Sequence, residues 1–147
     1  MVIKAPEPPK VKKERVYSSV EIKLAQIVMK FSQNDRLRLY RKIAALLRNR
    51  FSLMNALERL YNIASDDGKH QGETTAIAIS CWMESLQNGT SFSVALRGWA
   101  PQSELLMLSV GDVANLEDAL TSLIHVVEGT KRMKEPLVGA LAYPMFL

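Results

Sequence analysis

Apolar residues recur every three or four positions through most of the chain, from about residue 18 to residue 127. This spacing places them on one face of an α-helix, and the strict alternation typical of a half-buried β-strand does not occur. Short polar segments separate the periodic stretches, which favours antiparallel neighbours. The sequence therefore predicts an all-α fold, a compact antiparallel bundle of about six helices.

Polar residues indicate where several of these helices begin and end. Ser18 and Glu21 have the spacing of a capping box, and a second helix restarts at Ser32. The first helix would bury an apolar face that contains Ile22, Ala25, Ile27, Val28 and Phe31, and the third helix would bury a face that includes Ile63.

The last two helices have their own signals. Pro101 suits the first position of a helix, and Gly111 would stop that helix. Asp112 would lie in the turn that follows. Asn115 would cap the final helix, which begins near Leu116.

Composition changes at both ends of the chain. Residues 1–19 hold three prolines, five basic residues and two acidic ones, which indicates a disordered basic arm. Residues 20–135 would form the folded domain. Residues 136–147 (PLVGALAYPMFL) carry no charge and follow a basic cluster, a pattern that membrane proteins show at a cytoplasmic boundary. We interpret this segment as the truncated start of a first transmembrane helix; the alternative is a C-terminal helix packed in the domain's own core.

The residues needed for catalysis or metal binding are sparse. One cysteine and two histidines leave few candidate ligands, and the sequence motifs of nucleotide, zinc-protease and serine-hydrolase sites are absent. Asp66, Asp67, His70 and Glu73 could surround a metal, but the adjacent glycines favour a solvated loop. We therefore expect no enzyme activity, no cofactor and no metal site.

A basic stretch is the clearest candidate for binding. The net charge of the chain is +4, and the basic stretch contributes Arg36, Arg38, Arg41, Lys42, Arg48 and Arg50. Such a face could bind phosphates, but it contains a single aromatic residue and no base-reading motif. A solvated helix face or a contact for an acidic protein patch is therefore favoured over nucleic acid. The loop with Asp66 and Asp67 is a second candidate contact, and the basic arm a third.

Three ordered segments resemble one known family. The segment IAALLRNRFSLMNALE (43–58) is similar to a helix–turn–helix that opens the domain of type II secretion F-type proteins. NGTSFSVAL (88–96), then Pro101 and LSVGDVANLEDAL (108–120), resemble its second signature, and ALAYP (140–144) resembles the start of its first membrane span. The matched positions include Pro101, Gly111, Asp112, Asn115, Leu116 and Pro144.

The departures from the family pattern indicate a divergent branch, such as a type IVb or conjugative-plasmid pilus. Asn49-Arg50 replaces the turn glycine, and we expect Asn49 to tolerate the left-handed conformation. The signature glutamate is the shorter Asp112, and the second glycine is Ala114. A divalent ion proposed near this acidic position in some members is therefore not expected here.

The resemblance implies a non-enzymatic platform protein on the cytoplasmic face of the bacterial inner membrane. Its cytoplasmic domain would bind a hexameric assembly ATPase and pass the ATPase's motion to the membrane part. There, pilins and other inner-membrane assembly proteins would be partners. A homo-oligomer is also implied. The alternative that the residues leave open is a soluble helical nucleic-acid-binding or regulatory domain.

Overall fold

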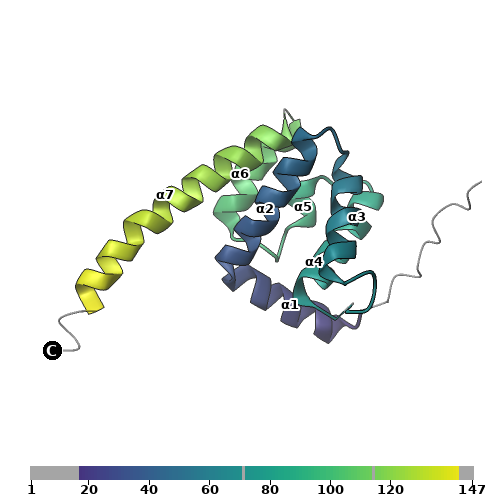
Figure 1. Ribbon diagram of the computed structural model, residues 1–147, viewed down its shortest axis with the longest axis horizontal. Helices are drawn as coiled ribbons and strands as arrows, with labels where there is room; N and C mark the ends of the chain where they lie inside the picture. The colour runs from purple at the N-terminus through teal and green to yellow at the C-terminus, as the bar shows by residue number, and fades with distance from the viewer. Residues whose placement is uncertain (1–16, 71, 114, 143–147) are drawn as a thin grey trace, which may run out of the picture.

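The computed structural model describes residues 17–70, 72–113 and 115–142, and these form seven α-helices and no β-strand (Figure 1). The helices are α1 (Ser19–Phe31), α2 (Gln33–Arg48), α3 (Leu53–Ala64), α4 (Thr74–Gln87), α5 (Phe92–Ala95), α6 (Gln102–Val113) and α7 (Leu116–Ala142). The all-α prediction is confirmed. There are seven helices where about six were expected, and they include the four-residue α5.

The first helix begins where its capping box predicts. The Glu21 N–H donates to Ser18 Oγ at 3.2 Å, and the Ser18 N–H donates to Glu21 Oε2 at 2.9 Å. Tyr17 packs against the hydrophobic core, so the folded part starts earlier than the expected boundary between residues 19 and 20. The rest of the predicted arm, residues 1–16, lies outside the described residues.

In the turn between α2 and α3, the left-handed conformation is adopted by Arg50 and not by Asn49, the residue expected to adopt it. Arg50 has φ 67°, whereas Asn49 has φ −83°. The Phe51 N–H donates to the carbonyl of Leu46 at 3.1 Å, and the Arg50 N–H donates to the carbonyl of Leu47 at 3.0 Å. This is the Schellman arrangement at a helix end, with Arg50 at the left-handed position that glycine usually occupies.

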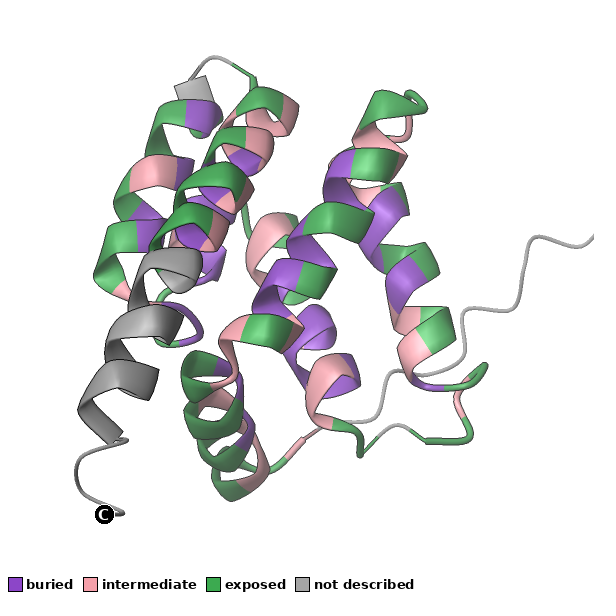
Figure 2. Cartoon of the chain, turned by 60° about the vertical axis from the view of Figure 1, so that its left-hand side comes forward, coloured by how far each residue is buried: buried purple, intermediate pink, exposed green. Residues whose placement is uncertain are grey.

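The core is built from the inward faces of the helices, which appear as the buried segments in Figure 2. Trp82 of α4 lies at its centre, with edge-to-face contacts to Phe92 and Trp99 at ring-centroid distances of 6.1 and 6.2 Å. The indole N–H of Trp82 is buried without a hydrogen-bond acceptor among the described residues. Tyr40, Leu57, Leu108, Leu120 and Leu123 are also fully buried.

Two ion pairs join α2 to α7. Arg41 pairs with Glu128, and Arg48 Nε lies 3.2 Å from Glu117 Oε1. The residue nearer the start of α2, Arg41, pairs with the residue farther along α7, Glu128. The residue at the end of α2, Arg48, pairs with Glu117 at the start of α7. The two helices therefore run antiparallel, and α7 is held against the bundle over its first half.

Helix α7 is 27 residues long, and its C-terminal half extends past the other helices in Figure 1. Among the described residues, no helix has both the length and the apolarity that crossing a bilayer requires. The predicted membrane segment 136–147 lies partly outside the described residues, and Pro144 is among those not described.

Candidate functional site: a cleft between α2 and the end of α3

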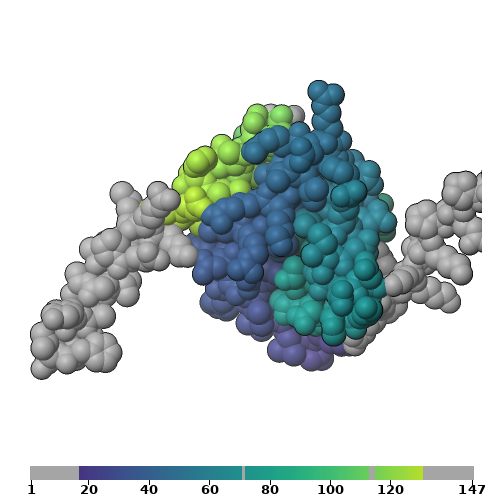
Figure 3. All heavy atoms as spheres, viewed as in Figure 1, coloured from purple at the N-terminus to yellow at the C-terminus, as the bar shows by residue number. Residues whose placement is uncertain are grey.

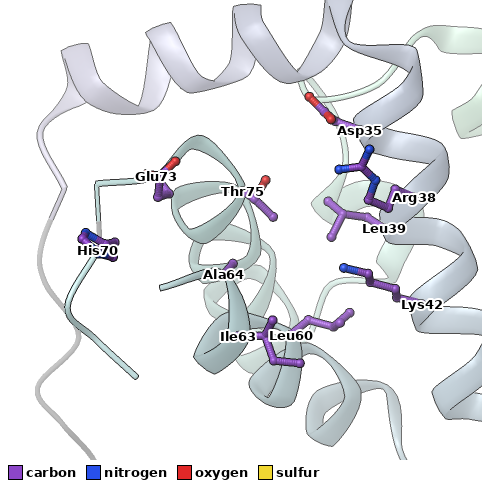
Figure 4. A pocket seen from close by; sticks show the side chains of 10 residues that line it. All are labelled: Asp35, Arg38, Leu39, Lys42, Leu60, Ile63, Ala64, His70, Glu73 and Thr75. Carbon is purple, nitrogen blue, oxygen red and sulfur yellow. The ribbon is translucent and has the colours of Figure 1, made fainter. Parts of the chain in front are cut away.

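A cleft of about 270 Å³ lies between α2 on one side and the end of α3, the following loop and the start of α4 on the other (Figure 4). It is lined by Asp35, Arg38, Leu39, Lys42, Leu60, Ile63, Ala64, His70, Glu73 and Thr75. Two segments that the sequence offered as separate binding candidates, the basic stretch and the 66–73 loop, thus meet at one site.

The floor of the cleft is apolar and its rim is charged. Leu39 and Leu60 are buried, whereas Ile63 is 69% exposed. Arg38 and Lys42 lie one helical turn apart on α2, and Figure 4 shows both side chains pointing across the cleft. His70 and Glu73 lie on the opposite side. Such a site fits an apolar side chain of a partner next to a carboxylate that reaches Arg38 or Lys42.

The six basic candidates do not share one surface. Arg38 and Lys42 line the cleft, Arg41 and Arg48 pair with glutamates of α7, and Arg50 is exposed in the turn after α2. The six cations therefore do not form one continuous basic face of α2.

Arg36 is not a surface residue, and its prediction as a partner contact is wrong. Its side chain is 4% exposed, and its Nη2 lies 2.9 Å from Glu104 Oε1. The same guanidinium donates to the carbonyls of Met29 and Lys30, at the end of α1. Arg36 can be buried in the core because all three nitrogens of its guanidinium donate hydrogen bonds.

Tyr40 completes this buried cluster. Its hydroxyl donates to Glu104 Oε2 at 2.8 Å. Burial, followed by the nearby charge of Glu104, raises the pKa of Tyr40 well above its ordinary value of 10.0. The cluster joins α1, α2 and α6 and leaves no cation or carboxylate of its own for a ligand.

The predicted acidic contacts lie beside the cleft and not in it. Asp66 and Asp67 are exposed and have φ of 48° and 55°, so they form the chain reversal after α3. The residues of this loop that line the cleft are His70 and Glu73. Within the part of the chain that the structure describes, no three His, Cys, Asp or Glu side chains are placed to hold a metal ion.

The family-motif residues have structural positions, and three predictions need correction. Gly111 does not stop α6, which continues to Val113, and Asp112 lies in that last turn of the helix. Pro101 is the N-cap of α6 and not its first residue, since its carbonyl accepts the Leu105 N–H at 3.2 Å. The predicted cap is present: Asn115 Oδ1 accepts the Asp118 N–H at 3.3 Å.

Gly111 is required by the close approach of α6 and α7. A Cβ at this position would lie 2.5 Å from Ala119 Cβ and 3.2 Å from the Cα of Leu116. Asp112 accepts hydrogen bonds from the backbone N–H and the hydroxyl of Ser93. Segments 88–96 and 108–120, which carry the resemblance, are therefore in contact.

Sequence reasoning missed most of the cleft's far side. Ile63 follows the apolar spacing of α3 and was assigned to the core, and Thr75 gave no signal.

Cys81 is half-buried on α4, and burial raises the pKa of its thiol to about 11. This agrees with an unreactive thiol.

Comparison of the sequence with models of known protein families gives no match, and comparison with curated proteins gives none.

Proposed function

We propose that this chain is the N-terminal cytoplasmic part of an inner-membrane platform protein of a type IV pilus or type II secretion machine. In this proposal the domain has no catalytic activity of its own. It binds the hexameric assembly ATPase through the cleft, and α7 passes the resulting movement toward the membrane. The ordered resemblance of residues 43–58, 88–96, 108–120 and 140–144 to that family supports this choice of machine.

The observation that carries the proposal is the position of α2. One side of this helix supplies Arg38 and Lys42 to the cleft, and Arg41 and Arg48 of the same helix pair with Glu128 and Glu117 of α7. A partner bound in the cleft would therefore contact α2, the same helix that forms the ion pairs with α7.

Continuity of α7 gives further support. The helix extends from Leu116 to Ala142 with no Gly/Ser linker between the part that α2 contacts and the part that leads to residues 143–147. A helix transmits displacement along its axis, whereas a flexible linker of the same length would absorb it.

A binding titration with the assembly ATPase of the same system tests the proposal. Arg38→Glu and Lys42→Glu reverse one charge each at the rim of the cleft, and each should weaken ATPase binding on the order of tenfold. Arg50→Glu is the matched control, because it makes the same charge change on α2's flanking turn outside the cleft. Its affinity should stay within about twofold of the wild-type value.

Two results would overturn the proposal. The first is wild-type affinity in both cleft variants; the second is no measurable binding of the wild-type chain to the ATPase. A titration with duplex DNA at low salt separates the alternative, since phosphate contacts would give an affinity that falls steeply with salt.

A further inference from the structure

Helix α1 exposes a row of large apolar side chains that no described element covers. Val20, Leu24, Ile27 and Phe31 are 66%, 59%, 56% and 83% exposed, and their spacing of four, three and four residues puts them on one helix face. The opposite face, with Ala25 and Met29, is buried in the bundle. The sequence-based expectation that Ile27 and Phe31 belong to the core is therefore wrong.

Positive charge borders this row. Lys23 and Lys30 are exposed and seven residues apart, so they lie along one edge of the row. The carboxylate of Glu21 accepts the Ser18 N–H and caps the helix. Residues 1–16, which lead directly into α1, contain five basic and two acidic residues.

The charge pattern does not fit a second copy of the same helix. In an antiparallel pair, the lysine edge of one copy would face the lysine edge of the other. In a parallel pair, Lys23 would face Val28 of the other helix, which offers no carboxylate. An anionic surface complements the lysine edge better than either arrangement of a second α1 helix does.

The shape of the face favours a bilayer. The α1 helix forms the lower margin of the molecule, where its purple atoms project from the body in Figure 3. An exposed apolar helix face with lysines along one edge fits the boundary between headgroups and acyl chains. There, apolar side chains insert and lysines reach the phosphates.

We propose that α1 is a membrane-surface helix, in which Val20, Leu24, Ile27 and Phe31 insert into an anionic bilayer while Lys23 and Lys30 contact lipid phosphates. This surface is separate from the cleft. The α1 variants and the cleft variants therefore test different claims, and either claim can fail alone.

Co-sedimentation of the 147-residue chain with vesicles tests this assignment. Wild-type protein should bind vesicles of phosphatidylcholine with phosphatidylglycerol more tightly than vesicles of phosphatidylcholine alone. The pairs Leu24→Gln with Phe31→Gln, and Lys23→Gln with Lys30→Gln, should each reduce partitioning on the order of tenfold. All variants retain residues 136–147, so any contribution of that apolar segment is constant.

Val110→Gln with Val126→Gln is the matched control. These valines are 68% and 53% exposed on α6 and α7, and their replacement should leave vesicle binding unchanged. Thermal unfolding of each variant verifies that the fold is retained.

Three outcomes would overturn the assignment. Wild-type partitioning by both α1 pairs, or equal binding of wild type to neutral and anionic vesicles, would each do so. The third is an α1 variant that loses self-association or ATPase binding and keeps its vesicle binding, because the face would then belong to a protein partner.

Discussion

Arg36 of α2 and Glu104 of α6 form an ion pair inside the core, with their side chains 4% exposed and Nη2 and Oε1 separated by 2.9 Å. The two residues are 68 positions apart in sequence, and their pair connects α2 to α6. Both charges have further hydrogen bonds, to the end of α1 and to Tyr40.

Glu104→Gln should therefore be strongly destabilising. The amide keeps the shape of the side chain but leaves the Arg36 guanidinium without a counter-charge, which costs about 3–5 kcal/mol in the free energy of unfolding. Urea unfolding measures this. Glu117→Gln, which removes the partly exposed pair with Arg48, is the control and should cost at most about 1 kcal/mol. Similar losses in both variants would show that the buried pair has no special role.

Gly111→Ala and Gly129→Ala should have opposite effects on stability. The new Cβ at position 111 would lie 2.5 Å from Ala119 Cβ, so α6 and α7 must separate, at a cost of about 1–3 kcal/mol. At position 129, within α7, a Cβ meets nothing within 4 Å, and alanine should stabilise the helix by about 0.5–1 kcal/mol. Thermal unfolding of the two variants checks the contrast; a stable Gly111→Ala protein would refute the close helix contact.

Asn115→Ala should cost about 1 kcal/mol, because the Asp118 N–H loses its acceptor at the start of α7. Urea unfolding measures the loss. Asn62→Ala changes an exposed residue within α3 and provides the comparison, with an expected change within about 0.5 kcal/mol. An unchanged midpoint for Asn115→Ala would remove the capping interpretation.

Alkaline pH should destabilise the protein through Tyr40. An unfolded tyrosine loses its proton near pH 10, whereas the raised pKa keeps folded Tyr40 protonated at higher pH. The unfolded state then binds fewer protons, so stability falls as pH rises above about 10, by up to about 1.4 kcal/mol per pH unit.

Unfolding curves of wild type and Tyr40→Phe between about pH 9 and 11 test this. The variant should be less stable at neutral pH by about 1–3 kcal/mol, because Glu104 loses a donor, yet its stability should fall less steeply above pH 10. Parallel curves would contradict the assignment of this titration to Tyr40.

The starts of α1 and α7 were predictable because their capping signals are local, whereas the helix boundaries expected at Pro101 and Gly111 were not observed. Ser18 and Glu21, and Asn115 with the helix it caps, bond within a few residues of each other. The conformation of Arg50 was not predictable, because arginine has no intrinsic preference for the left-handed region and adopts it here only where the helix end imposes it.

Which apolar faces are covered could not be predicted from helical spacing. Phe31 and Ile63 follow the spacing of core residues but are mostly exposed, because coverage depends on where other helices lie. Arg36 had a readable signal: it lies four residues before Tyr40 and seven before Ile43, on the buried face of α2. The burial of Arg36 was nevertheless not predicted, because a charged residue is expected at the surface and its partner Glu104 is distant in sequence. The cleft was predictable only as two separate polar segments.

The hydrogen bonds from Arg36 to the carbonyls of Met29 and Lys30 have a mechanical consequence for α1. They fasten the C-terminal end of this helix to the buried ion pair, so α1 cannot swing outward as a tethered arm unless core hydrogen bonds break. The exposed face of α1 therefore has a fixed orientation relative to the rest of the bundle. If α1 lies on a membrane surface, as proposed, that contact fixes the angle between the bundle and the membrane, and with it the direction in which the cleft opens.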